Sequence, residues 1–140
     1  MAASFQLRLV TPTGIVFEGV VQEVVAKSPL GQFGVLADHI NFITSLVPGV
    51  LSARLDDGSL RNWVVSGGLA EVKAGVMTVL ASGAEEPEDM DASKAAAEVQ
   101  AADEKFSSLS FYDPDYAAAN DALMLARAHA EAASLKNPGS

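Results

Sequence analysis

The chain has 140 residues, of which 49% are hydrophobic and 19% are charged, and its formal net charge is −9. This length and composition allow one sizeable core and exclude a chain that is disordered throughout. The nine basic residues are scattered along the sequence. A nucleic-acid partner is not expected, because neutralising phosphates needs clustered Lys and Arg.

The sequence contains no cysteine, which removes disulfides and thiolate chemistry and fits a reducing compartment. The N-terminus MAASFQLRLV lacks a positive region followed by a long apolar stretch. No apolar run approaches the roughly 20 residues that span a bilayer. We therefore expect a cytoplasmic protein without direct bilayer insertion.

Composition changes near residue 85. Fourteen of the fifteen valines lie in residues 1–84, whereas residues 85–140 hold fifteen alanines and twelve of the eighteen acidic groups. Because β-branched residues favour strands and alanine favours helices, the change predicts two domains. We expect an all-β sandwich in residues 1–86 and a C-terminal antiparallel α-helical hairpin in residues 87–140.

Within the first part, alternating apolar and polar residues predict strands at 5–9 and 51–55. Turns are predicted at Thr13-Gly14, Asp57-Gly58 and Lys73-Ala74-Gly75. The glycine pairs Gly31/Gly34 and Gly67/Gly68 precede no helix, so they predict tight turns and bulges, not a phosphate loop. The strands are expected to be short and to form a meander.

Two helices are predicted in the second part. Asp91 is the expected N-cap of the first, and Asp113 that of the second, with Pro114 at the first helical position. A stop is predicted at 136–139. Apolar stripes recur at helical spacing in both helices: Ala95, Val99, Ala102, Phe106 and Leu109 in the first, and Tyr116, Ala119, Leu123, Ala126, Ala130 and Ala133 in the second. An alanine seam buries little area, so this hairpin should be the weaker module and able to move.

Catalysis has weak support in the sequence. A triad would have to use Ser66, His39 and Asp38, but VVSGG continues into a strand, and adjacent Asp38 and His39 do not ordinarily orient one another. The remaining histidine, His129, completes no metal-ligand spacing. We expect no catalytic residue, no metal and no cofactor. A small hydrolase using His39 and Ser66 stays as an alternative.

Two motif blocks resemble a known family. GQFGVLADHINFITSLVPG (31–49), followed by VSGGLAEV (65–72) and VMTVLAS (76–82), is similar to the epsilon subunit of the bacterial F-type ATP synthase. MDASKA (90–95) and DYAAANDALMLARAHAEA (115–132) match its two helices. The resemblance runs essentially from end to end.

The resemblance implies a non-catalytic subunit of the central stalk. Its sandwich would grip the gamma subunit and rest on the c-ring, at the cytoplasmic face of the bacterial inner membrane. The hairpin would permit rotation when folded against the sandwich. Extended along gamma into the catalytic head, it would contact the alpha and beta subunits and oppose ATP hydrolysis. A mature plastid or mitochondrial counterpart also stays open. The implied loop and contact residues toward the c-ring and gamma are Gly31, Gln32, Phe33, Gly34, His39, Asn41 and Phe42.

The sequence departs from the family at that loop. Gln32 stands where an acidic residue is usual, Ala37-Asp38 replaces Pro-Gly, and Asn41 replaces a common proline. We therefore expect a less stiff loop and a neutral hydrogen bond from Gln32 to the ring.

The family's ATP-binding motif is degenerate here. Asp91 is present, but Lys94 stands in place of an arginine, and Arg127 is the one arginine of the second helix. Lysine cannot reproduce the bidentate contact of a guanidinium. A nucleotide-sensing regulator built on these three residues remains the alternative function; otherwise Asp91 simply caps the helix.

Family inhibition also relies on basic residues of the second helix. This chain offers Arg127 and Lys136 there, with Asp121 and Glu131 nearby. Since like charges oppose insertion beside an acidic segment, we expect the hairpin to be a weak inhibitor by itself.

Overall fold

The computed structural model describes residues 3–135, which form nine strands followed by three helical segments. The strands are β1 (Phe5–Thr11), β2 (Gly14–Ser28), β3 (Gly31–Leu36), β4 (Phe42–Leu46), β5 (Gly49–Leu55), β6 (Leu60–Val65), β7 (Gly68–Lys73), β8 (Val76–Ala81) and β9 (Ala84–Glu85). The helical segments are the 3-10 turn η1 (Pro87–Asp89), α1 (Ala92–Ser107) and α2 (Tyr116–Ala133).

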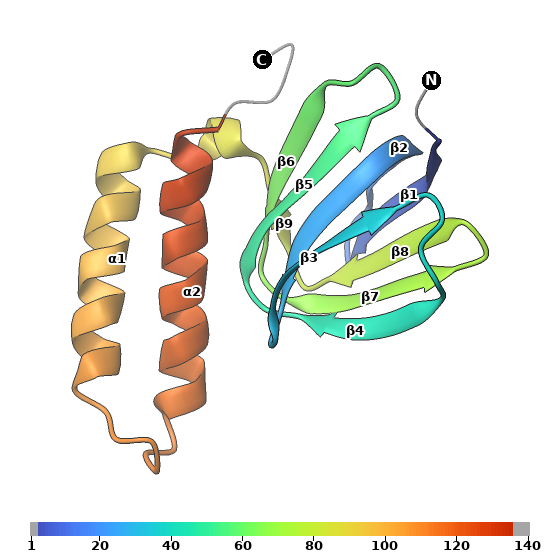
Figure 1. The fold of residues 1–140 in the computed structure, drawn as a ribbon. Helices are drawn as coiled ribbons and strands as arrows, with labels where there is room; N and C mark the ends of the chain where they lie inside the picture. Colours follow the sequence, from blue (N-terminus) through green and yellow to red (C-terminus); the bar gives the residue numbers. More distant parts are fainter. Residues whose placement is uncertain (1–2, 136–140) are drawn as a thin grey trace.

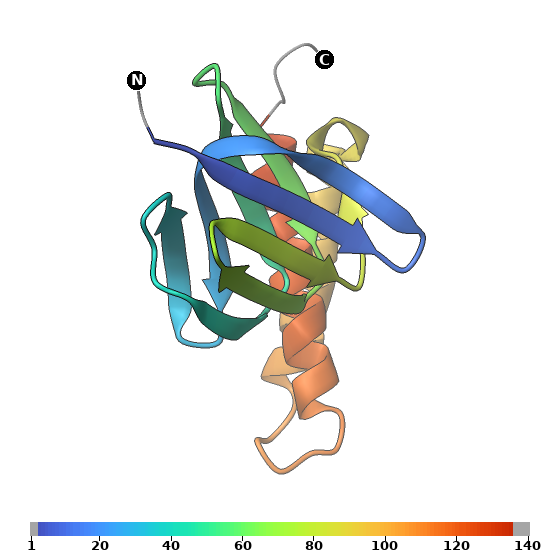
Figure 2. The ribbon, with the colours of Figure 1, turned by 90° about the vertical axis from the view of Figure 1, so that its right-hand side faces the viewer.

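The strands build a sandwich in which β2 belongs to both layers (Figures 1 and 2). One layer runs β4-β7-β8-β1 to the first half of β2, and the other continues from the second half of β2 through β5, β6 and β9, with β3 on the opposite edge of β2. The register of β2 shifts between Val21 and Glu23, where its partners change. A bulge of this kind lets one strand bend from sheet to sheet.

The core lies between the two layers. Along β1, Phe5, Leu7 and Leu9 are buried while the residues between them face outward, which confirms the predicted alternation. The largest fully buried side chains include Leu51 and Trp63 from the second layer. The sheet residues that alternate inward thus supply most of the apolar burial that stabilises the fold.

The three predicted turns are confirmed as the β1–β2, β5–β6 and β7–β8 connections. At the second, Asp57 Oδ1 accepts hydrogen bonds from the hydroxyl and the backbone N–H of Ser59, and these bonds lower the pKa of Asp57. The strand predicted by VFEGVVQEVVAK (16–27) is confirmed within β2, which is 15 residues long because it serves both layers. One expectation is wrong: the sheet is not a simple meander, because β1 pairs with β8 in parallel.

Helix α1 begins as predicted, with Asp91 Oδ1 accepting the Lys94 backbone N–H at 2.9 Å. Helix α2 begins two residues later than Pro114, with Asp115 as its N-cap residue, so the predicted Asp113 cap is wrong. Asp113 instead accepts the Asp115 N–H at 2.9 Å within the connecting turn. The predicted stop at 136–139 lies outside the described residues.

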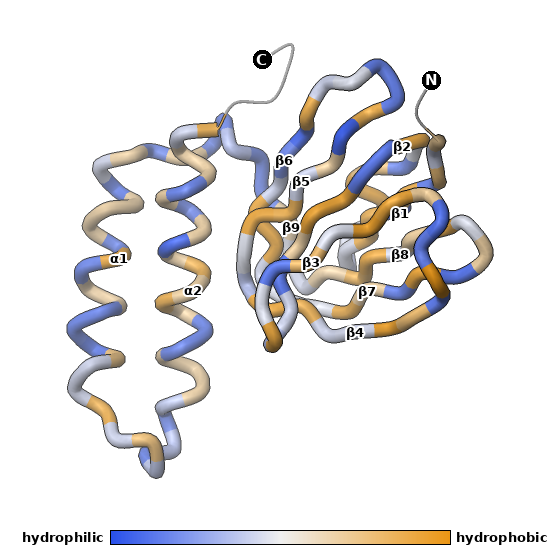
Figure 3. Tube along the Cα trace, in the orientation of Figure 1, coloured by the Kyte–Doolittle hydropathy of each residue, from blue (hydrophilic) through white to orange (hydrophobic). Residues whose placement is uncertain are grey.

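The two helices form an antiparallel hairpin, and α2 lies between α1 and the sandwich (Figure 1). The predicted stripes face each other, with Ala95, Ala119 and Leu123 buried. The Phe106 and Tyr116 rings meet at 4.8 Å near the hairpin tip, which projects past the sandwich (Figure 2). Figure 3 shows the hairpin alternating between hydrophilic and weakly hydrophobic stretches, whereas the strands carry more of the strongest hydrophobic colour.

Candidate functional site

The first part of the predicted contact loop is a strand. Residues 31–36 form β3, which pairs with the second half of β2 from Ser28↔Gly31 to Glu23↔Leu36. The turn falls earlier, at Pro29 and Leu30, where the Ser28 hydroxyl accepts the Leu30 N–H at 3.1 Å. Gly31 and Gly34 suggested a loop. The sequence does not show that β2 extends to Ser28 and that its backbone there can pair with residues 31–36.

A row of aromatic rings, Phe33, Phe42 and His39, which we call the aromatic ladder, joins β3 to β4 and the connection between them. His39 and Phe42 have ring centroids 4.8 Å apart, and Phe42 meets Phe33 edge-on at 5.9 Å. Asn41 Oδ1 accepts the Ala74 backbone N–H at 3.1 Å, which ties the β3–β4 connection to the β7–β8 turn. A proline at 41 could not make this bond, so the departure from the family pattern anchors the connection that we expected it to loosen.

Large aliphatic side chains are exposed around this ladder. Leu30, Leu36, Ile40 and Ile43 are each at least 59% exposed. A groove of about 410 Å³ runs between Gln32, Phe33, His39 and Ile43, and a cavity of about 550 Å³ opens on the other side of His39. We call Leu30, Phe33, Leu36, His39, Ile40, Phe42 and Ile43 the β3–β4 surface. A contiguous exposed apolar patch of this kind marks an interaction site.

A second apolar feature crosses the outer face of the layer formed by β4, β7, β8, β1 and the first half of β2. Cross-strand pairing aligns Leu69 with Leu80, Leu80 with Val10, and Val10 with Ile15. These four residues, the aliphatic row, extend across β7, β8, β1 and β2, and Ile15 and Leu80 are half exposed or more.

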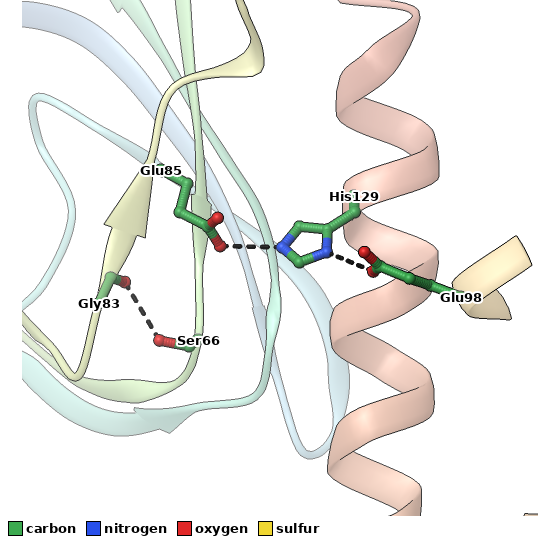
Figure 4. Close-up of polar contacts among 5 residues, drawn as sticks. All are labelled: Ser66, Gly83, Glu85, Glu98 and His129. Carbon is green, nitrogen blue, oxygen red and sulfur yellow. Dashed lines mark hydrogen bonds and ion pairs between the residues drawn. The ribbon is translucent and has the colours of Figure 1, made fainter. Parts of the chain in front are cut away.

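The residues of the alternative hydrolase are engaged with backbone groups. Ser66 Oγ donates to the Gly83 carbonyl at 3.4 Å (Figure 4), and His39 Nδ1 lies 2.9 Å from the Ile40 carbonyl oxygen. These contacts give no support to a nucleophile–base pair.

The possible nucleotide residues lie on both helices of the hairpin. Contacts between α1 and α2 join residues whose numbers sum to 222 for Phe106–Tyr116 and to 227 for Glu98–His129. Arg127 is therefore level with residues 95–100 of α1, which is roughly 1.5–9 Å along the helix from Lys94. Asp91 Oδ1 accepts the Lys94 backbone N–H as the cap of α1. A nucleotide site at these three residues stays a prediction.

Sequence reasoning missed the face of α2 that packs on the sandwich. Ala128 and Ala132 are buried against Val50 and Val64, which point outward from β5 and β6. Partly buried Met90, Leu125 and Leu135 surround them. The spacing of 125, 128 and 132 was a usable signal, because it marks a second helical stripe beside the one that faces α1.

His129 joins the two parts of the molecule (Figure 4). Its Nε2 lies 2.8 Å from Glu85 Oε1 on β9, and its Nδ1 lies 2.9 Å from Glu98 Oε2 on α1. Burial lowers the pKa of His129, but the hydrogen bonds to Glu98 and Glu85 outweigh it and hold the pKa above 6.5. A second bridge, Lys27 Nζ to Glu131 Oε2 at 3.0 Å, also links the sandwich to α2.

A small β-sandwich with exposed apolar surfaces, carrying a helical hairpin on few contacts, is the architecture of an interaction subunit. Residues 4–87 match the family described as ATP synthase, Delta/Epsilon chain, beta-sandwich domain. The chain belongs to this family, and the curated relatives that it matches include ATP synthase epsilon chains. The resemblance seen in the sequence is confirmed, as is the expected sandwich followed by a hairpin.

Two relatives illustrate the match. The ATP synthase epsilon chain of Synechococcus sp. (strain WH7803) is 37% identical over 132 residues, covering 93% of this chain and 96% of the relative. That of Prochlorococcus marinus (strain MIT 9303) is 38% identical over 111 residues, covering 79% and 83%.

The fold also matches a chain of the Euglena gracilis mitochondrial ATP synthase, solved with OSCP, F1 and the c-ring. The TM-score is 0.79 at 27% identity, with 95% of this chain and 82% of that chain covered. Within residues 3–135, neither helix combines the length and the apolarity needed to cross a membrane.

Proposed function

We propose that this chain is a non-catalytic rotor subunit of a proton-translocating F-type ATP synthase. It couples the gamma subunit to the c-ring, peripherally at the cytoplasmic face of the bacterial inner membrane. The observation that supports this best is the Synechococcus relative, because its match covers 93% of the chain and therefore includes the hairpin.

Residues 1–86 supply the grip in this proposal. The β3–β4 surface, with Gln32 on its edge strand, contacts the c-ring and the adjoining part of gamma. The aliphatic row offers gamma a second contact on the outer face of β7, β8, β1 and β2. The outer face of β5 and β6 is covered by α2. Exposed apolar residues at these two places become favourable only when a partner removes them from water.

Residues 87–140 supply regulation. Among the described residues, the interface with the sandwich buries Val50, Val64, Ala128 and Ala132, with Met90, Leu125 and Leu135 partly buried around them. A buried valine contributes about 1.5–3 kcal/mol and an alanine less, and the partly exposed Lys27–Glu131 pair adds little. The hairpin can therefore detach while the sandwich core stays folded, and reach the alpha and beta subunits.

Co-purification tests the grip. An affinity-tagged chain expressed with gamma should retain it, and Ile43→Lys should lower that affinity at least tenfold, because it places a charge in the β3–β4 surface. Leu60→Lys, at a position 44% exposed at the start of β6, is the matched control and should leave binding unchanged. A chain that binds no gamma, or that loses it equally with both variants, contradicts the proposal.

A further inference from the structure

His129 sits between two carboxylates that come from different parts of the fold. Glu85 belongs to the last strand of the sandwich, whereas Glu98 belongs to the hairpin itself. The His129 side chain is 15% exposed, against 47% and 50% for Glu85 and Glu98. The ring therefore bridges the two carboxylates across the interface between α2 and the sandwich (Figure 4).

The hydrogen-bonding capacity of imidazole decides which form of the ring fits. A neutral imidazole has one N–H donor and one acceptor nitrogen, whereas an imidazolium has two donors, and an ionised carboxylate only accepts. With both ring nitrogens within 2.9 Å of a carboxylate oxygen, only the doubly protonated ring satisfies both contacts. A neutral ring would turn a lone pair toward one carboxylate.

The surrounding charges do not relieve that conflict. From the sandwich, Glu85 faces the ring directly, and neighbouring Glu86 pairs with Arg61 at 3.3 Å. From α1, the facing group is Glu98. On α2, Glu131 is paired with Lys27, and Arg127 is exposed. The segment η1, which contacts α2, carries the acidic residues Glu88 and Asp89.

We propose that His129 is a proton-dependent latch, whose doubly protonated ring holds the hairpin on the sandwich by bridging Glu98 to Glu85 and whose deprotonation favours release. The latch rests on the proposed function only in that it needs a hairpin able to detach. When the hairpin leaves as a unit, Glu98 stays with the ring and the contact with Glu85 is lost. A neutral ring can then donate to Glu98 while water satisfies its other nitrogen.

The direction of the pH effect follows from linkage. Docking adds the hydrogen bond and the charge of Glu85, both of which raise the pKa of His129, to a ring that keeps Glu98 in either state. Docking therefore takes up a proton between the pKa of the detached hairpin and the higher pKa of the docked state. The contribution of the bridge is fully present below the first of these values and is lost as the pH rises through the second. Within that window the ratio of docked to detached hairpin falls by up to about tenfold per pH unit.

Methyl NMR of the full-length chain measures this ratio directly. The methyl groups of Val50 and Val64 lie under α2, so their signals report docking, and Ala132→Glu supplies the detached reference. From pH 6 to 9 the docked fraction of the wild-type chain should fall, and 15N spectra should show a doubly protonated His129 ring in the docked state.

Three variants isolate the latch. His129→Gln cannot titrate, so its docked fraction should not change with pH. Glu98→Gln should stay docked at high pH, because its amide can donate to the neutral ring while the ring donates to Glu85. His39→Gln, which removes the other histidine of the sequence, should keep the wild-type pH dependence.

The outcomes separate the latch from the proposed function. A pH dependence that survives in His129→Gln, or a wild-type docked fraction that is partial but constant with pH, overturns the latch alone. Val50 and Val64 signals that stay docked in every chain, Ala132→Glu included, overturn both the latch and the detachable hairpin.

Discussion

Gly68 occupies a position where any side chain would collide with the neighbouring strand. Its φ is +148°, and a Cβ there would strike the carbonyl oxygen of Leu80 and lie 2.9 Å from the Cα of Ala81. Both atoms belong to the backbone of β8, so neither can move without disturbing the β7–β8 ladder. Packing and backbone conformation thus explain the second glycine of the Ser-Gly-Gly motif.

We expect Gly68→Ala to lower the free energy of unfolding by about 3 kcal/mol, from the collision and the unfavourable φ together. Gly58→Ala is the control: its φ is +88°, but nothing lies within 4 Å of the added Cβ, so strain alone should cost about 1 kcal/mol. Urea unfolding followed by fluorescence of Trp63, the single and fully buried tryptophan, measures both. If both variants lost the same free energy of unfolding, the added Cβ at position 68 would not collide with β8, and the prediction would be wrong.

Sequence reasoning at the residue scale works where the partner is local. The Asp91 cap is three residues from the N–H that it accepts, so it could be predicted. The contacts of His129 could not, because Glu98 is 31 residues away and Glu85 is 44. Asp113 shows a limit even for local signals. Its side chain could cap a helix that starts at Pro114, or it could accept the N–H of Asp115 in a turn before the helix. The structure has the turn, and α2 begins at Tyr116.

At the scale of elements, periodicity predicted which residues face inward but not which edges pair. The alternation of β1 and the two facing helical stripes were recovered from spacing. The parallel pairing of β1 with β8 and the extension of β2 along β3 depend on contacts that the chain makes only once it is folded. The face of α2 that packs on the sandwich could not be predicted either, because the residues that it contacts, Val50 and Val64, belong to the β-sandwich, far from α2 in the sequence.

The thin interface between α2 and the sandwich makes a single buried charge sufficient to detach the hairpin. Ala132 is fully buried against the β5–β6 face, so Ala132→Glu must either bury an unpaired carboxylate or release α2. We expect release, seen as loss of the docked Val50 and Val64 signals, with Trp63 fluorescence unchanged. Ala122→Glu, at an exposed position of the same helix, should leave the hairpin docked. A loss of Trp63 burial in the first variant would show that the sandwich depends on the hairpin.

At the scale of the whole molecule, the bridges that hold the hairpin also mask part of its charge. In the docked state, Glu131 is paired with Lys27 and His129 lies between Glu85 and Glu98. Extension breaks the first pair and leaves Glu131 unpaired on a helix that also carries Asp121 and whose one arginine is Arg127. The remaining basic residue that we considered, Lys136, lies outside the described residues. An extended α2 thus presents little positive charge to an acidic partner.

This charge balance predicts a weak brake. In the purified ATP synthase complex, removing residues 88–140 should raise ATP hydrolysis by less than about twofold, which corresponds to about 0.4 kcal/mol in the barrier. The rate should be measured at pH 6 and again at pH 9, because release of the latch at high pH would favour any inhibition by an extended hairpin. Glu131→Lys in the full-length chain is the matched test of cause: it breaks the Lys27 bridge and adds positive charge to α2, so it should inhibit more strongly than the wild type. A large activation on truncation, at either pH, would contradict the weak-inhibitor hypothesis and assign the brake to contacts other than charge.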